Sequence, residues 1–67
     1  MVSRDEAREL ARAECERQGI AFEEPISVNG GPLHYSVWTR SGTRGGNAIV
    51  SVHRWTGAVQ LRGVIPR

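Results

Sequence analysis

A chain of 67 residues forms at most one domain, predicted to span residues 1–67, and such a chain buries only about 60% of the surface that its unfolded form exposes. We therefore expect a small stability margin. Cys15 is the only cysteine, which excludes an internal disulfide and a metal site with several thiolate ligands. All nine basic residues are Arg, which excludes a lysine nucleophile.

The net charge of +2 is unevenly distributed along the chain. Residues 1–24 contain all seven acids together with four Arg, whereas residues 25–67 contain five Arg and no acid. We therefore expect the second part of the chain to face anionic partners, if it faces any.

The chain contains no apolar run long enough to cross a bilayer. Its first residues also lack the apolar core of a signal peptide. We therefore expect a cytoplasmic protein with no membrane contact.

The first segment is typical of an amphipathic helix, because Ala, Leu, Arg and Glu dominate it. Ser3 and Glu6 have the spacing of a capping box at its start, and Gly19 suits the residue that follows its end. The expected apolar stripe consists of Ala7, Leu10, Ala11 and Cys15. This stripe is thin, so we expect Ile20 and Phe22 to add to its contact with a sheet.

Alternation of apolar and polar residues predicts strands over residues 33–40, 47–55 and 58–65. Residues 41–46 form a loop, and Gly57 takes a positive φ in the second turn. Residues 26–28 are a candidate edge strand. We predict an α+β fold in which one N-terminal helix packs on a three-stranded, possibly four-stranded, antiparallel β-meander.

A symmetrical closure of the loop over residues 41–46 predicts the register of the first two long strands. It pairs Arg40 with Asn47, Trp38 with Ile49, Ser36 with Ser51, His34 with His53, Tyr35 with Val52, and Val37 with Val50. In the last strand, alternation directs Val59, Leu61 and Ile65 toward the helix, and Gln60, Arg62 and Val64 away from it.

The face of the sheet opposite the helix, called the open face below, is the predicted binding surface. It is expected to carry His34, Trp38, Arg40, Ile49, His53, Trp55 and Arg62. Exposed patches of aromatic and Arg side chains concentrate binding energy, so we expect a protein partner or a second copy in a homodimer. The competing interpretation is that residues 20–32 fold over the tryptophans and complete the core.

Other chemistry receives less support from the sequence. His34 and His53 supply only two metal ligands, so no metal site and no cofactor are predicted. The acids lie on the helix and its exit while the histidines lie on strands, so no catalytic set converges and no enzyme is predicted.

A small nucleic-acid-binding protein is the alternative function. It would use Arg40, Arg44, Arg54 and Arg62 together with Tyr35, Trp38 and Trp55, although alternation directs Tyr35 and Arg54 toward the helix.

Residues 49–59 (IVSVHRWTGAV) resemble the strand, Thr-Gly turn and strand that close PepSY domains, and the YrhB-like bacterial immunity families look similar there. The helix over residues 3–13 also matches the way both families begin. PepSY domains usually carry an acid before the turn, where this chain has His53 and Arg54. The resemblance implies a small helix-on-sheet module that binds a protein, either a peptidase to be inhibited or a toxin to be neutralised.

Overall fold

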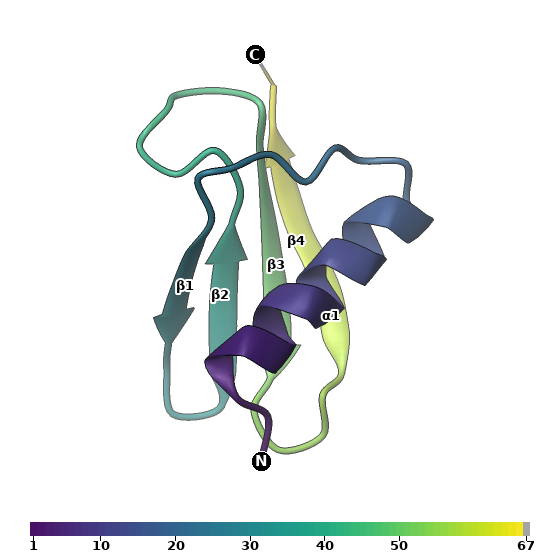
Figure 1. Ribbon diagram of the computed structural model, residues 1–67, viewed down its shortest axis with the longest axis vertical. Helices are drawn as coiled ribbons and strands as arrows, with labels where there is room; N and C mark the ends of the chain where they lie inside the picture. Colours follow the sequence, from purple (N-terminus) through teal and green to yellow (C-terminus); the bar gives the residue numbers. More distant parts are fainter. Residues whose placement is uncertain (67) are drawn as a thin grey trace.

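The computed structural model describes residues 1–66 as one helix, α1 (Arg4–Arg17), followed by four strands. The strands are β1 (Ser27–Gly30), β2 (His34–Trp38), β3 (Asn47–His53) and β4 (Val59–Ile65). They form one antiparallel sheet in the order β1-β2-β3-β4, and α1 crosses one face of it diagonally (Figure 1). The predicted α+β fold is confirmed, with four strands. Within residues 1–66, no helix has the length and apolar character needed to span a membrane.

Both ends of α1 lie where the sequence places them. The Glu6 N–H donates to Ser3 Oγ at 3.2 Å, and the Ser3 N–H donates to Glu6 Oε1 at 3.1 Å, which completes the capping box. Gln18 caps the other end, and Gly19 follows it with a φ of 72°. The capping signals therefore predicted the helix boundaries correctly.

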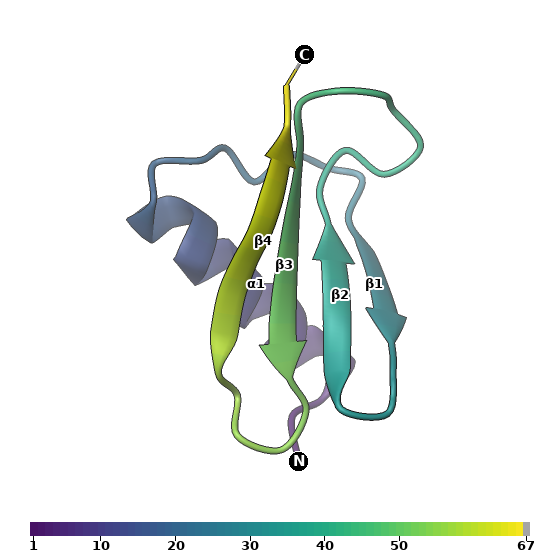
Figure 2. The ribbon, with the colours of Figure 1, turned by 180° about the vertical axis from the view of Figure 1, so that it is seen from behind.

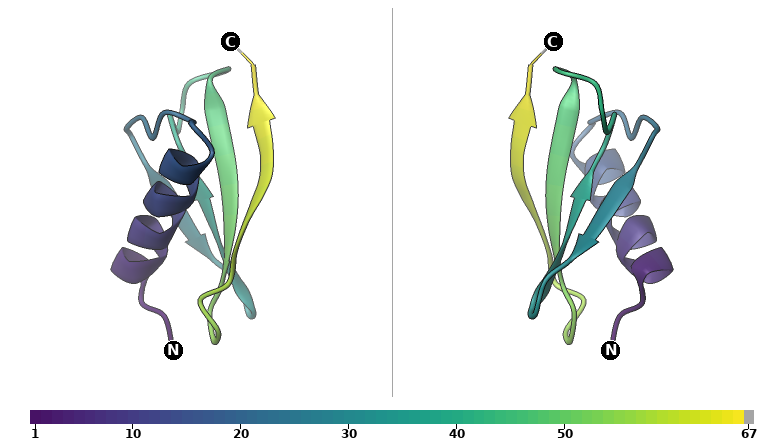
Figure 3. Two further views of the ribbon diagram at one scale, coloured as in Figure 1. Left: turned by 90° about the vertical axis from the view of Figure 1, so that its right-hand side faces the viewer. Right: turned by 90° about the vertical axis from the view of Figure 1, so that its left-hand side faces the viewer.

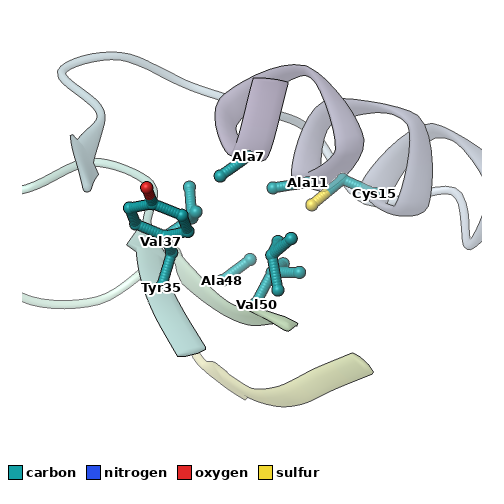
Figure 4. Close-up of a cluster of buried hydrophobic side chains, with 8 residues drawn as sticks. Ala7, Ala11, Cys15, Tyr35, Val37, Ala48 and Val50 are labelled. Atoms are coloured by element: carbon teal, nitrogen blue, oxygen red, sulfur yellow. The ribbon is translucent and has the colours of Figure 1, made fainter. Parts of the chain in front are cut away.

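The core between α1 and the sheet consists mainly of small and β-branched side chains (Figure 4). It contains Ala7, Ala11 and Cys15 from the helix, and Tyr35, Val37, Ala48, Val50 and Val52 from the sheet. Small helical residues let the helix lie close to the strands. Burial raises the pKa of the Cys15 thiol, with the nearby Glu14 carboxylate adding to the effect, so this side chain acts as core packing rather than as a nucleophile.

Residues 18–26 connect α1 to β1 on the helix-covered side of the sheet (Figure 3). The N–H groups of Arg40 and Ser41 donate to the carbonyls of Glu23 and Pro25, each at 2.8 Å, and fix this path. Seen from behind, the sheet is covered by no other helix or strand of the described chain (Figure 2). The interpretation in which residues 20–32 cover the tryptophans is therefore wrong.

The pairing of β2 with β3 confirms the predicted register from His34–His53 to Trp38–Ile49. The pairing of β3 with β4 shifts at Arg62, an extra residue of β4 that forms a β-bulge. The predicted faces of the next two strand side chains are consequently wrong, because strict alternation leaves no room for an extra residue. Val64 lies on the helix side, opposite the buried Ala48, and Ile65 lies on the open face, opposite Asn47.

Candidate functional site

The open face is formed by alternate residues of all four strands and has three distinct parts. Its residues are Ser27 and Asn29 of β1, His34, Ser36 and Trp38 of β2, Ile49, Ser51 and His53 of β3, and Gln60, Arg62, Gly63 and Ile65 of β4. Asn29, Ser36, Ser51 and Gln60 form a polar row across its middle. The histidines lie at one end. The other end, next to the loop over residues 39–46, is the apolar end, defined as Trp38, Ile49, Gly63 and Ile65.

The apolar end is a continuous row of neighbours on adjacent strands. Trp38 pairs with Ile49, and Ile49 pairs in turn with Gly63 on β4. Trp38 and Ile49 are half-buried, whereas Ile65 is 36% exposed. Apart from the adjoining Arg62 and Val64, a Cβ atom added at Gly63 would meet no atom within 4 Å, so the flank of Ile49 above β4 is uncovered.

An open hollow of about 590 Å³ adjoins the apolar end. Trp38 and Ile65 form its walls from the sheet, and loop residues close the rest. The loop contributes Ser41, Gly42, Thr43, Arg44 and Gly45, and Asn47 lies at its base. The hollow therefore combines an indole, an aliphatic side chain and one cation.

Asn47 holds the loop that borders this hollow. Its side chain is 3% exposed, and its Nδ2 donates to the carbonyls of Thr39, Arg40 and Thr43 at 2.9, 3.0 and 3.1 Å. Its Oδ1 accepts the N–H of Gly45 at 2.9 Å. One buried side chain thus satisfies four backbone groups, so the loop shape is set by the strand beneath it.

Arg40 does not belong to the open face. β2 ends at Trp38, and Arg40 takes a φ of 48°, so the predicted pairing with Asn47 does not form. Its Nη1 lies 3.2 Å from Glu23 Oε2, in the segment on the helix side. The predicted placement of Arg40 is wrong because alternation assumes that the strand continues.

The two histidines meet as predicted, but one of them has a structural role. The rings of His34 and His53 pack edge to face with centroids 4.9 Å apart. His53 Nδ1 accepts the N–H groups of Trp55 and Thr56 at 3.2 and 3.3 Å, so the ring holds the turn that follows β3. Among residues 1–66, no group of three or more His, Cys, Asp or Glu is placed to hold a metal ion.

Trp55 lies apart from Trp38. It follows the end of β3 in the turn and is 63% exposed, whereas Trp38 lies beside the opposite end of β3. The predicted site therefore divides into two places at the two ends of the sheet. The two tryptophans were predicted as one site because both were assigned to the same face, although the predicted register separates them along β3.

The basic residues of the sheet differ in how they are engaged. Arg54 donates to the Gly31 carbonyl at 2.7 Å and lies 5.0 Å from the Tyr35 ring centroid, on the helix side as alternation predicts. The Arg62 Nη1 donates to Gln60 Oε1 at 3.0 Å across the open face. Arg44 makes no hydrogen bond or ion pair within residues 1–66. Within the described part of the chain, Arg44 and Arg62 are thus the cations left beside the open face.

The sequence analysis missed three residues of this end, and two of them carry a usable signal. Gly63 interrupts an otherwise regular strand, which is typical of a bulge or of a close approach by another molecule. Asn47 follows two glycines at a strand start, where Asn side chains often bond the backbone of the preceding loop. Ile65 reached the open face only through the bulge, which alternation does not show.

No protein-family model, curated protein or solved structure matches this chain. The resemblance to PepSY and YrhB-like families therefore stays a prediction from residues 49–59 and from the order of the elements.

Proposed function

We propose that this chain is a non-catalytic protein-binding module of the inhibitor or immunity type, and that it binds its partner through the open face. The observation that carries the proposal is the apolar end, where the half-buried Trp38 and Ile49 lie with the exposed Ile65, and where Trp38 and Ile65 line the hollow. Aromatic side chains in such settings supply much of the energy of protein association. No helix or further strand of the described chain lies over this face (Figure 2).

The other surfaces of the sheet are less suited to a partner. α1 covers the opposite face. At one edge, β1 has only four residues, and Arg4 Nη1 donates to the Val28 carbonyl. At the other edge, β4 carries the bulge and the exposed cation at Arg62. Short strands, bulges and edge cations all oppose the addition of another strand, so they favour binding through the face.

Nucleic-acid binding is the alternative, and it rests on fewer cations than the sequence suggests. Arg40 is paired with Glu23, and Arg54 is engaged by Gly31 and Tyr35. Among residues 25–66, Arg44 and Arg62 are the cations left to meet phosphates, and two such contacts give binding to single strands a slope of about −1.4 in log affinity against log salt. Titration with random oligonucleotides at low and moderate salt tests this alternative, and no binding at low salt excludes it.

Self-association also stays a prediction. A face-to-face dimer would bring Arg44 and Arg62 of two copies together without an acid of residues 25–66 between them, which favours a different protein as partner. Light scattering decides the point, since a species of 7.4 kDa at all concentrations excludes a homodimer.

The proposal is tested by affinity capture, in which the immobilised chain is offered the proteins encoded beside its gene. The affinity of any captured protein is then measured by calorimetry after purification. Trp38→Ala is expected to weaken binding by about 2 kcal/mol or more while the variant stays folded. Trp55→Ala removes the same side chain from the other end of the sheet and is expected to change the affinity little. A partner that binds Trp38→Ala as tightly as the wild type, or no captured protein at all, contradicts the proposal.

A further inference from the structure

Gly63 leaves a gap in the apolar end that its backbone conformation does not require. Its φ lies outside the positive region that favours glycine, and a Cβ there would meet no atom within 4 Å outside the two adjoining residues. Any strand-forming residue would therefore fit the folded chain and stabilise the strand more than glycine does. Arg62 and Gly63 together oppose Ile49 in the bulge, but a bulge requires glycine only where φ is positive, and the φ of Gly63 is not. Glycine within a strand marks either a bulge or a place where another molecule approaches closely, and the second reason is the one left for Gly63.

The walls of this gap are apolar. Ile49 borders Gly63 across the strands, and Ile65 follows it on the same face of β4. Trp38 lies on the far side of Ile49 and continues the surface into the hollow. One Leu, Ile or Phe side chain of a partner, placed over Gly63, would contact both isoleucines.

One cation lies next to this gap in the chain, and a second lines the adjoining hollow. Arg62 directly precedes Gly63 and extends over the open face toward Gln60. Arg44 lines the hollow together with Trp38 and Ile65. The acids of the chain lie in residues 1–24, so none in residues 25–66 neutralises these cations. Desolvation of the apolar gap by an occupant would strengthen the attraction between each guanidinium and a carboxylate beside it.

We propose that the occupant is an acidic segment of the partner protein, in which Asp or Glu residues flank one large apolar side chain that packs over Gly63. This inference rests on the proposed function and adds the chemistry of the partner. A second copy of the chain fits less well, because its own acidic segment is engaged: Glu23 pairs with Arg40 and Glu24 with Arg8. A nucleic acid fits less well because aliphatic walls suit an aliphatic side chain better than a polar base edge.

The test uses a random dodecapeptide library displayed on phage, selected on the full chain, and then calorimetry with the consensus peptide. Selected peptides are expected to be enriched in Asp and Glu beside Leu, Ile or Phe. Gly63→Val fills the gap and is expected to weaken peptide binding about tenfold or more while the melting temperature is unchanged or higher. Ser51→Val is the matched control, since it adds the same side chain to the polar middle of the open face.

The charge part of the inference is tested by Arg44→Gln and Arg62→Gln. The double variant is expected to lose about tenfold in affinity, and the peptide affinity of the wild type is expected to fall with added salt. Selected peptides without acidic enrichment overturn the inference, and so do peptides whose affinity is the same for the wild type and both Gln variants. In either case the proposed function stands if Trp38→Ala still abolishes capture of the partner protein. Competition by random oligonucleotides for the Gly63 gap, or a library that yields no binder, also overturns it.

Discussion

The two faces of the sheet use the same strands for different purposes. Along β3, Val50 is fully buried beneath α1, whereas its neighbours Ile49 and Ser51 are half-buried on the open face. Each helix-side residue contacts other residues of the chain, so its substitution should change folding. Each open-face residue borders solvent, so its substitution should change recognition more than folding. One strand of seven residues can therefore contribute to folding through one face and to recognition through the other, because its side chains alternate between the two faces.

The largest expected effect comes from placing a charge on the helix side. Val50→Asp buries an unpaired carboxylate against Ala11 and Cys15 of the core cluster. A chain of this size has a total stability of only about 3–10 kcal/mol, so the variant should be unfolded at 25 °C by circular dichroism. Ser51→Asp adds the same charge to the next residue, on the open face, and should remain folded. A cooperative melt of Val50→Asp near the wild-type temperature would refute the assignment of faces.

A smaller but substantial effect is expected where a buried polar side chain holds the loop. Asn47→Ala leaves the carbonyls of Thr39 and Thr43 and the Gly45 N–H without the partner that holds them. The expected cost is about 2–3 kcal/mol, measured by chemical denaturation. Asn29→Ala is the control, because Asn29 is exposed and should matter by less than about 0.5 kcal/mol. Equal effects of the two substitutions would mean that Asn47 does not organise the loop.

The helix cap is expected to contribute less to the free energy of unfolding than Asn47 does. Ser3→Ala removes the hydroxyl that accepts the Glu6 N–H, at an expected cost of about 1 kcal/mol. For a domain of this size, that corresponds to a fall in melting temperature of about 4–8 °C. Ser36→Ala on the open face removes a hydroxyl with no capping role and serves as the control. An unchanged melting temperature for Ser3→Ala would place the start of α1 elsewhere.

Acid is expected to weaken the helix end through Glu14. Its carboxylate is 5% exposed and accepts hydrogen bonds from Arg17, with Nη2 at 2.6 Å, and from Gln18, and these bonds lower its pKa below the ordinary 4.5. A folded-state pKa below the unfolded value contributes stability above about pH 4.5, and this contribution disappears as the pH falls through the folded value.

The measurement is the melting temperature as a function of pH below 5 for Glu14→Gln and for Glu16→Gln. Glu14→Gln should flatten the profile, and the remaining slope should come in part from Glu6, whose pKa is lowered by its bonds to Ser3. Glu16 is exposed, so Glu16→Gln should keep the wild-type profile. Identical profiles for the two variants would exclude a role for Glu14.

Local signals in the sequence predicted most of the fold. The Ser3–Glu6 spacing and Gly19 determined the helix ends, and alternation with a six-residue loop determined the β2–β3 register. Local signals failed where the backbone leaves its regular path. Arg40 adopts a positive φ, and the bulge at Arg62 exchanges the faces of the residues after it.

The candidate site was predicted only in part for the same reasons. Trp38, Ile49 and Arg62 lie on the open face as expected, and His34 and His53 pair at its other end. The predicted register already places Trp55 beyond the His34–His53 pair and away from Trp38, but grouping residues by face alone joined the two tryptophans into one site. The gap at Gly63 and the place of Ile65 beside the hollow depend on the bulge in β4, which strict alternation does not contain.

The thermal unfolding of Trp38→Ala, followed by circular dichroism, tests the central claim most directly. If the open face is a recognition surface, the variant should unfold in one cooperative transition and have a native far-ultraviolet spectrum at 25 °C, although it loses the largest side chain of β2. A Trp38→Ala protein that is as unfolded as Val50→Asp would show that Trp38 is core, and it would contradict the account of the open face as a binding surface.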